Sequence, residues 1–458
     1  MDSVLRRSAV QAVRALRRGE VSPLELVDAA ADRIAETEPT VHALVARCLD
    51  RARDRARRLP AARSAAADHP AWLAGLPVTV KDVVDVAGLP TTFGSPVRRQ
   101  PAGRTDPLVA RIERRGAIVV GKTNLPEFCS GADTVSPVAG RTANPLDPSL
   151  SCGASSGGAA ASVAAGQAWC AHGTDTAGSI RIPAAFCGAV GLRPTPGLVP
   201  AGHPDPAGFE VHGPLARDVA DAALFFAAMV GQPPPDRPGG PFPRRLAAVS
   251  LDLGGTVPVD SEIRQSCARA AALLEGLGCA VEEAVPALDV PELRTVHEAA
   301  VTLLGHRAAV LHGDRVDRHG DAIGPALRAE VAAGRRIPPD LLDAARSTRE
   351  RFRHAVVRFF DRYDVLVTPA FGVPPWPVPD GAGPYPDEPQ LSRIAAVWPL
   401  TTLAPMAGCP AITVPVGRTA AGHPVGLQLT GPPMSDLRLL RAARALEAAG
   451  THAGQAAR

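Results

Sequence analysis

Two lysines stand out as residues that could act as bases in this chain. Lys81 and Lys122 are the only lysines among its 49 basic residues, and all the others are arginine. Arginine supplies positive charge equally well but does not lose its proton in proteins, whereas a buried lysine can deprotonate and then accept a proton. A lysine retained in such an arginine-rich chain is therefore a candidate for a task that arginine cannot perform.

Two loops rich in small residues contain candidate serine nucleophiles, at residues 151–158 and 173–183. Small side chains allow close approach of backbone or ligand, and successive N–H groups of a glycine-rich turn can converge on a developing oxyanion. A phosphate cradle is disfavoured because neither GxGxxG nor GxxxxGK[ST] is present. Residues 153–157 match the GxSxG nucleophile elbow. That elbow needs a strand directly before it, and the turn-forming residues 144–150 argue against one.

The remaining interpretation joins both serine loops to Lys81. A serine hydroxyl is a poor nucleophile until a neighbouring base removes its proton. Lysine has an ordinary pKa of about 10.4, so it can be that base near neutral pH only where burial disfavours the ammonium. The apolar neighbours Val78, Val80, Val83 and Val84 predict such burial.

These segments resemble the motifs of the amidase signature family. Residues 153–200 are similar to the family's GGSSGG loop followed by GTDxGGSIRxPA, with Ser155 and Ser179 at the family's spacing. Further similar segments are residues 76–82, 121–128, 213–217, 410–415 and 424–429. The resemblance covers nearly the whole chain and is weakest over residues 290–364.

The resemblance implies roles for individual residues. Ser179 would attack the substrate carbonyl, and Ser155, preceded by a cis peptide bond, would relay its proton to and from Lys81. The implied oxyanion hole consists of the backbone N–H groups of Thr176, Ala177, Gly178 and Ser179. The implied supporting residues, which would brace the loops by hydrogen bonding, are Ser156, Asp175 and Arg181.

The implied reaction is hydrolysis of a carboxylic amide, or of an ester, through a Ser179 acyl-enzyme. It would release ammonia or an amine and then a carboxylate, with no metal and no organic cofactor. Ala154 and Ala177 depart from the family, which usually has glycine there; alanine is tolerated if φ is negative and strained if φ is positive. Lys122 is expected to bond loop carbonyls in a structural role. His172 is expected to be a packed or hydrogen-bonded neighbour rather than a general base.

Alternatives remain open within and outside the family. A glutamine-hydrolysing subunit of a tRNA amidotransferase has the same motifs and works beside partner chains. Trp398, which stands where such subunits carry an aspartate that recognises glutamine, argues against it. An amide-forming acyltransferase of the family would let an amine resolve the acyl-enzyme, and a non-catalytic binding protein would leave Ser179 unreactive. The substrate pocket is expected from residues 127–132, residues 202–211 and parts of residues 290–364.

The elements that must position these residues can also be predicted. Ser22, Pro23 and Glu25 form a helix start in an N-terminal segment, residues 1–60, that is predicted to be helical. A further helix is predicted after a capping Asp260 or Ser261. Short apolar runs predict buried strands at residues 77–86, 117–120, 246–251, 365–368, 411–416 and 425–429.

Strands alternating with helices predict an α/β fold, with a mixed central β-sheet flanked by α-helices. We expect a single domain over residues 1–458, in which residues 290–364 shape the substrate site.

Composition narrows the class of protein. The chain is 46% apolar and 21% charged, which is typical of a globular protein. Its net charge of +3 and the lack of a dense basic stripe disfavour nucleic-acid binding.

No signal peptide is visible, and no run of about 18 apolar residues predicts a membrane span. The cysteines form no CxxC pair, so neither a zinc site nor a disulfide framework is predicted and a reduced cytoplasmic setting is expected. The expected partner is a small-molecule amide, and a homodimer is compatible with the sequence.

Overall fold

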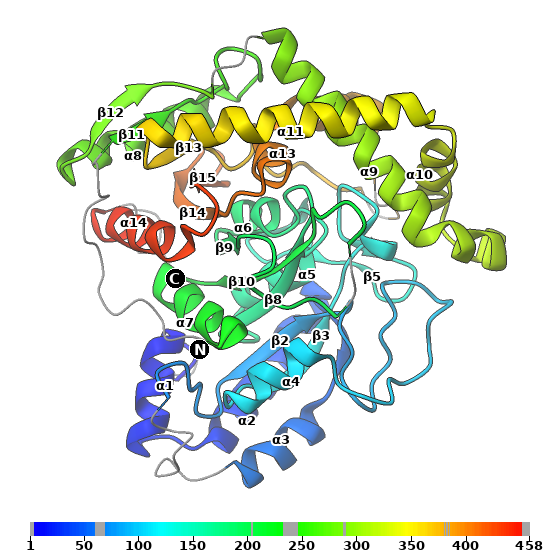
Figure 1. Ribbon diagram of the computed structural model, residues 1–458. Helices are drawn as coiled ribbons and strands as arrows, with labels where there is room; N and C mark the ends of the chain where they lie inside the picture. The colour runs from blue at the N-terminus through cyan, green and yellow to red at the C-terminus, as the bar shows by residue number, and fades with distance from the viewer. Residues whose placement is uncertain are drawn as a thin grey trace.

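A mixed β-sheet forms the centre of the molecule (Figure 1). The computed structural model describes residues 4–59, 69–202, 205–231, 246–286, 290–379, 381, 383 and 385–450. Within these residues the sheet has 11 strands, in the spatial order β1 (Leu44–Arg47), β3 (Ile118–Thr123), β2 (Pro77–Lys81), β8 (Cys170–Asp175), β10 (Val211–Ala216), β9 (Val190–Arg193), β14 (Ala411–Arg418), β15 (Pro424–Thr430), β13 (Val365–Pro369), β11 (Leu246–Val249) and β12 (Ala280–Glu283). Two short hairpins lie outside it: β4 (Val135–Ser136) with β5 (Gly140–Arg141), and β6 (Ala143–Asn144) with β7 (Asp147–Ser151). The mixed sheet confirms the expected fold class.

Successive strand residues bury their side chains on opposite faces of the sheet. In β13, Val365 and Val367 join one apolar cluster while Leu366 joins another. The first cluster includes residues of α1 (Ala9–Arg18), α4 (Pro107–Arg114), α7 (Val219–Val230), α8 (Ser261–Gly276) and α14 (Asp436–Ala448). The opposite face is covered by α5 (Gly157–Ala164), α6 (Arg181–Cys187), α9 (Val290–His319), α11 (Pro339–Arg362), α12 (Glu388–Val397) and α13 (Pro399–Ala407). The remaining described helices are α2 (Pro23–Val41), α3 (Leu49–Arg58), α10 (Pro325–Arg335) and the short η1 (Glu127–Cys129) and η2 (Gly320–Ala322).

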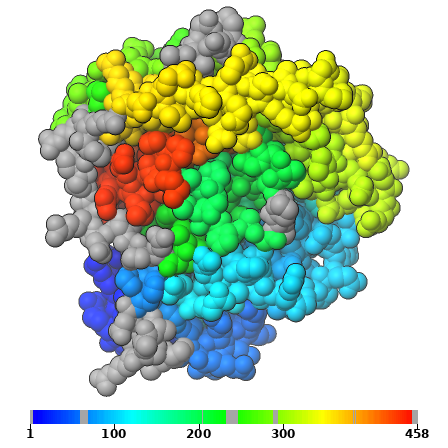
Figure 2. Space-filling view, viewed as in Figure 1, coloured from blue at the N-terminus to red at the C-terminus, as the bar shows by residue number. Residues whose placement is uncertain are grey.

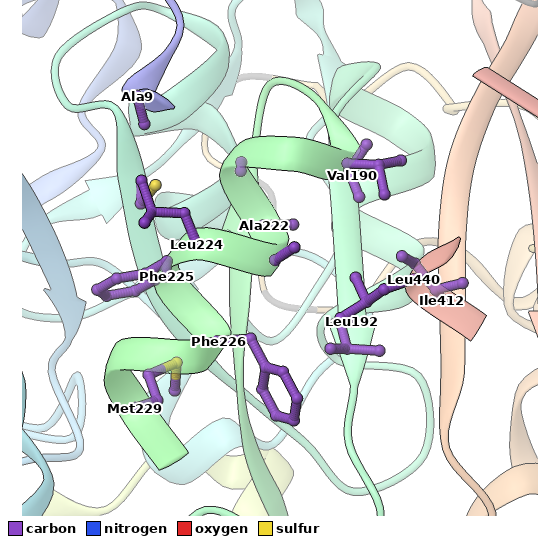
Figure 3. Close-up of a cluster of buried hydrophobic side chains, with 14 of the residues drawn as sticks. Ala9, Val190, Leu192, Ala222, Leu224, Phe225, Phe226, Met229, Ile412 and Leu440 are labelled. Atoms are coloured by element: carbon purple, nitrogen blue, oxygen red, sulfur yellow. The ribbon is translucent and has the colours of Figure 1, made fainter. Parts of the chain in front are cut away.

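Helix α7 is the most apolar of the covering helices, and Figure 3 shows how it packs. Phe225, Phe226 and Met229 extend from it, while Val190 and Leu192 of β9 stand nearby. All five side chains are at most 3% exposed. Burial of a side chain of this size stabilises the fold by about 1.5–3 kcal/mol, so this interface stabilises the centre of the sheet, where β10 lies between β8 and β9.

The segment at residues 290–364 is almost wholly helical. Its helices α9, α10 and α11 form one outer wall of the molecule, and α11 crosses the upper part of the view in Figure 2. Glu127 links this wall to the N-terminal half of the chain. Its carboxylate accepts hydrogen bonds from Ser95 Oγ at 2.5 Å and from the Gly324 N–H at 2.6 Å. The wall therefore borders the segment that follows β3.

Both predicted helix starts are confirmed. Ser22 Oγ accepts the N–H of Glu25, and the Glu25 carboxylate accepts the N–H of Ser22, which is a complete capping box. Asp260, rather than Ser261, caps α8, because its carboxylate accepts the N–H of Glu262. No helix in the described ranges is long and apolar enough to span a membrane.

Several strand predictions were wrong in extent. The N-terminal segment is not wholly helical, because β1 pairs with β3 at one edge of the sheet. The strand predicted at residues 77–86 ends at Lys81 and turns directly afterwards. The central strands β8, β9 and β10 were not predicted. The residues before Ser155 form β7 in addition to turns, although β7 belongs to a small hairpin and not to the main sheet.

Candidate active site

Lys81 is the last residue of β2, and its side chain is fully buried. Its Nζ lies 2.7 Å from Ser155 Oγ, 3.0 Å from Ser156 Oγ and 2.9 Å from Thr174 Oγ1. Strands β2 and β8 run parallel, so their carboxyl ends meet at the same edge of the sheet. This edge therefore brings together the lysine and the two serine loops.

The three hydroxyl groups around Lys81 can accommodate a neutral amine. Ser156 Oγ donates its proton to the Thr174 carbonyl at 3.1 Å, so it must accept a proton from Lys81 Nζ. A neutral amine has two protons and one lone pair. If Thr174 Oγ1 accepts the second proton, the lone pair is left for the hydroxyl of Ser155, the shortest of the three contacts.

The electrostatic surroundings also favour the uncharged form. Burial lowers the pKa of Lys81, and nearby Cys129, Glu210 and Asp175 oppose this shift only in part. The predicted neighbours Val78, Val80, Val83 and Val84 are all buried around the end of β2.

The first serine loop has, just before Ser155, the cis peptide bond that the resemblance implied. The Ala154–Ser155 peptide bond is cis, and α5 begins two residues later. Gly157 and Gly158 lie in the first turn of α5, where a Cβ would stand 2.2 Å from Thr134 Oγ1 or 2.5 Å from the backbone nitrogen of Asn124. Only glycine fits at these two positions, which explains the small-residue pattern after Ser155.

The second serine loop connects β8 to α6 and is held against the first. The N–H of Ser156 donates to the Ser179 carbonyl at 3.0 Å. Ser179 is partly exposed, and its hydroxyl forms no hydrogen bond with the part of the chain that the structure describes. The side chain is thus accessible while its backbone is fixed beside Ser155 and Ser156.

The Asp175 carboxylate holds this loop in place by hydrogen bonding. Its carboxylate accepts the N–H groups of Gly178 at 2.9 Å and Ile180 at 3.2 Å, and two contacts from Arg181 at 2.9 Å each. Burial alone would raise the pKa of Asp175, but the charges and hydrogen bonds of Arg181, with Arg193, lower it below the ordinary value. The carboxylate therefore stays charged and keeps the loop in place. Ser156, Asp175 and Arg181 make the bracing contacts that were expected of them.

The same geometry corrects one expected oxyanion donor. Because the N–H of Gly178 points to Asp175, it is not free to bond a substrate oxygen. The N–H groups of Thr176, Ala177 and Ser179 have no acceptor among the described residues, and all three residues are partly exposed. An oxyanion hole at this loop would use those three groups.

The two alanines that replace glycine are unstrained. Positive φ occurs at Gly153 and Gly178, which are glycines, and not at Ala154 or Ala177. Alanine is compatible with negative φ, so neither substitution distorts the loops.

The other lysine has quite different surroundings. Lys122 Nζ donates to the Pro90 carbonyl and to Thr91 Oγ1, each at 2.7 Å, and forms an ion pair with Asp82 at 2.6 Å. Its expected structural role is consistent with these contacts, although the ion pair had not been foreseen. Lys122 ties the segment after β2 to β3.

His172 is a hydrogen-bonded neighbour, as expected. Its Nδ1 accepts the backbone N–H of Lys81 at 3.3 Å, and its Nε2 lies 2.8 Å from His212 Nδ1 on β10. Burial, His212 and Lys81 together hold the pKa of His172 well below its ordinary value. The imidazole is therefore neutral and supports the strand that carries Lys81.

The three segments expected to line the pocket do meet. Arg307 of α9 pairs with Asp205 and Glu210, and Ser130 Oγ donates to Glu330 of α10 at 2.6 Å. Two residues of the second segment, 203 and 204, lie outside the described residues. In the described part of the chain no group of three or more His, Cys, Asp or Glu side chains could hold a metal ion.

Sequence reasoning missed several residues of the site. Thr174 bonds Lys81 directly, and its place in the GTD motif was the only signal for it. Arg193 donates to the Asp175 carbonyl at 2.6 Å, and Gln428 accepts Arg181 Nη1 at 2.7 Å. Trp398 donates its indole N–H to the Ala177 carbonyl at 3.0 Å, a contact between residues far apart in the chain.

Comparison with known proteins places this arrangement in a family. The family model described as Amidase matches residues 25–440. A glutamyl-tRNA(Gln) amidotransferase subunit from Symbiobacterium thermophilum is 34% identical, over 97% of this chain and 97% of its own. A solved bacterial aryl acylamidase of the amidase signature family superposes with a TM-score of 0.86 at 27% identity, over 98% of this chain and 97% of its own.

The corresponding amidotransferase subunit from Thermotoga maritima has also been solved. It superposes with a TM-score of 0.75 at 24% identity, over 98% of this chain and 96% of its own, a likeness of fold alone. The match over most of the chain and the shared fold lead to one conclusion: the protein belongs to the amidase signature family and is a hydrolase that acts on amide C–N bonds.

Proposed function

We propose that this enzyme hydrolyses a small-molecule carboxylic amide, with Ser179 as nucleophile, Ser155 as proton relay and Lys81 as base. The observation that carries the proposal is the buried Lys81 amine, 2.7 Å from Ser155 Oγ and bonded to hydroxyl groups.

Acylation follows from this geometry. Neutral Lys81 accepts the proton of Ser155, which accepts the proton of Ser179 as the Ser179 oxygen attacks the carbonyl carbon. The N–H groups of Thr176, Ala177 and Ser179 would stabilise the oxyanion; removing one such donor typically costs about 10²–10³-fold in kcat. The C–N bond then breaks, and the proton returns through Ser155 to the leaving nitrogen, which departs as ammonia or an amine.

Deacylation reverses the relay with water as the nucleophile. Water loses a proton through Ser155 to Lys81 as its oxygen bonds the acyl carbon. The acyl–oxygen bond to Ser179 then breaks, and the proton returns from Lys81 through Ser155 to the Ser179 oxygen, which releases a carboxylic acid and restores the neutral amine. Esters should be cleaved as well, since the same oxyanion forms.

The test is a screen of primary amides for ammonia release, with Ser179→Ala as the blank. Ser266→Ala, which removes a buried hydroxyl in α8 away from the site, is the matched control. We expect turnover by wild type and Ser266→Ala and none by Ser179→Ala. Intact mass and peptide mapping after reaction with an activated ester should place the acyl group on Ser179. Turnover by Ser179→Ala, or an adduct on Ser155, contradicts the proposal.

A second candidate is the glutaminase subunit of a tRNA amidotransferase. The specific observation in its favour is the curated relative that is named as an amidotransferase subunit, 34% identical over nearly the full length. Trp398 argues against it, because an apolar ring stands where glutamine recognition would need an acidic group. Ammonia release from glutamine, together with partner chains that co-purify with the enzyme, would establish this candidate in place of the first.

The proposal includes a cytoplasmic location and a small-molecule partner. Fractionation of cells that express the natural protein, followed by sizing of the native assembly, tests both points. A stable complex with other chains would favour the second candidate.

A further inference from the structure

Trp398 occupies a junction directly above the nucleophile loop. It is the residue between α12 and α13, and its indole N–H donates to the Ala177 carbonyl at 3.0 Å. Thr401, one turn along α13, donates its hydroxyl to the same carbonyl at 2.9 Å. Two helix-borne donors therefore converge on one oxygen of the loop.

These donors complete the fixation of a single peptide unit. The carbonyl of Ala177 and the N–H of Gly178 belong to the same planar unit. Its oxygen is held by Trp398 and Thr401, and its N–H is held by Asp175. This fixed unit lies between the two peptide units that carry the N–H groups of Ala177 and Ser179, so it restrains the backbone on one side of each. These N–H groups are two of the three groups that remain for an oxyanion.

A pair of aromatic rings lies beside this loop. The His297 ring of α9 meets the Trp398 ring edge-on, with ring centroids 6.1 Å apart and planes at 68°. Trp398 is partly exposed, like Ala177 and Ser179. Burial lowers the pKa of His297, so this imidazole is uncharged at neutral pH. Its Nδ1 is buried without a partner among the described residues.

Arg307, further along α9, gives no net attraction for an acidic substrate. Arg307 is already paired with Asp205 and Glu210, two carboxylates for one guanidinium. Glu210 is also close enough to act on the pKa of Lys81. A carboxylate on the substrate would therefore face negative charge near the base.

Resting on the serine amidase function proposed above, we propose that Trp398 is both a positioning residue and a specificity-determining residue. Its indole N–H orients the nucleophile loop, and its ring, with that of His297, selects amides whose acyl group is uncharged and aromatic. Aromatic rings prefer edge-on or offset contacts with one another, which this pair offers to a planar acyl group.

Kinetic measurements with benzamide, acetamide and succinamate as substrates distinguish the positioning role of Trp398 from its role in specificity. Wild type should prefer benzamide in kcat/KM by about fivefold or more, since an aromatic contact contributes about 1 kcal/mol beyond its apolar area. Trp398→Phe retains a ring but loses the donor, so kcat should fall about five- to tenfold for both neutral amides, with little change in KM. His297→Ala should raise KM for benzamide and leave that for acetamide unchanged.

The matched control is Trp72→Phe, which removes another indole N–H from a buried tryptophan far from the loop. Circular dichroism verifies folding of each variant. If Trp398→Phe does not fold, Thr401→Val removes the other donor to the same carbonyl and should lower kcat in the same way.

This inference is overturned, while amide hydrolysis itself stands, by any of three results. Wild type prefers acetamide or succinamate, Trp398→Phe and Thr401→Val keep the wild-type kcat, or Trp72→Phe loses as much kcat as Trp398→Phe. Failure of wild type on every amide, with no acyl adduct on Ser179, overturns the proposed function and this inference with it.

Discussion

Lys81 and Lys122 form a natural comparison, because both are fully buried and lie on neighbouring strands. Lys122 faces the Asp82 carboxylate, which opposes the lowering of its pKa by burial. Lys81 contacts hydroxyl groups, which stabilise an ammonium less than a carboxylate does. The surroundings therefore favour Lys81 over Lys122 as the base, in line with the roles that the sequence motifs implied for the two lysines.

The pH dependence of turnover should follow the state of Lys81. Because burial lowers its pKa, the amine becomes available at lower pH than that of an exposed lysine. Protonation removes the base, so kcat/KM should fall as pH falls through that pKa and level off above it. A pH–rate profile with a neutral amide measures this. A rate that rises on acidification contradicts the assignment.

Cys129 provides a chemical probe of the same site. The other seven cysteines are buried, whereas Cys129 is partly exposed and interacts with Lys81. Alkylation with N-ethylmaleimide should abolish turnover, a substrate amide should protect against it, and Cys129→Ala should resist it. Residual activity is measured against time of exposure. Equal inactivation of Cys129→Ala would show that the thiol lies away from the substrate.

At the scale of elements, the connection between β8 and α6 decides where the nucleophile stands. Gly178 has φ +118°, and a Cβ there would lie 2.8 Å from Thr401 Cβ, whereas Ala177 next to it has negative φ. Gly178→Ala should therefore lose activity and stability. Ala177→Gly should retain activity and lose about 0.4–1 kcal/mol of unfolding free energy through backbone entropy. Denaturant titration and amide turnover of both variants test this. Equal effects would mean that the loop is not held as described.

Elements with regular local patterns could be predicted from the sequence, and elements stabilised by distant partners could not. Strands such as β13 and β15 are continuous apolar runs, and the Ser22 cap is local. Strand β8 reads CAHGTD, and its buried His172 is satisfied by distant partners, His212, 40 residues away, and the N–H of Lys81, 91 residues away. Trp398 likewise bonds a carbonyl 221 residues away. The motifs identified Lys81, Ser155 and Ser179 as candidate site residues. They did not predict that the Gly178 N–H donates to Asp175.

At the scale of the whole molecule, one sheet passes from β1 near the N-terminal helices to β12 at its opposite edge, and both core clusters pack on it. This continuity supports the prediction of a single domain, which limited proteolysis would test. The helices α9 and α10 join the core through Glu127, Arg307 and Glu330, so the predicted pocket segments are linked by buried or half-buried polar contacts.

Buried histidines should make the fold sensitive to acid. The folded pKa of His172 lies well below the ordinary 6.5, so below that pH the unfolded chain binds a proton that the folded chain does not. Stability from this group is complete above pH 6.5 and is lost as pH falls towards the folded pKa, by up to about 1.4 kcal/mol per pH unit. Burial also lowers the pKa values of the half-buried His297 and His312, which act in the same direction. Burial raises the pKa values of Asp221 and Glu447 to about 7, so these carboxyl groups bind protons in the folded chain and oppose the loss.

The contribution of the histidine pair is separated from that of these groups by comparing the pH dependence of the unfolding free energy in wild type and in a variant without the pair. The double variant His172→Leu/His212→Val should show a shallower loss of unfolding free energy between pH 6.5 and 5 than wild type, by about 1 kcal/mol per pH unit. Urea titrations at stepped pH measure it. Parallel curves would mean that the pair is not neutral in the folded protein.

The central claim, that an uncharged amine at position 81 drives acylation of Ser179, is tested most directly by Lys81→Met. Methionine keeps most of the side-chain length and lacks the base, so the variant should fold as wild type does while the rate of Ser179 acylation by an activated ester falls by about 10²–10⁴-fold. A folded Lys81→Met that acylates Ser179 at the wild-type rate would contradict the account.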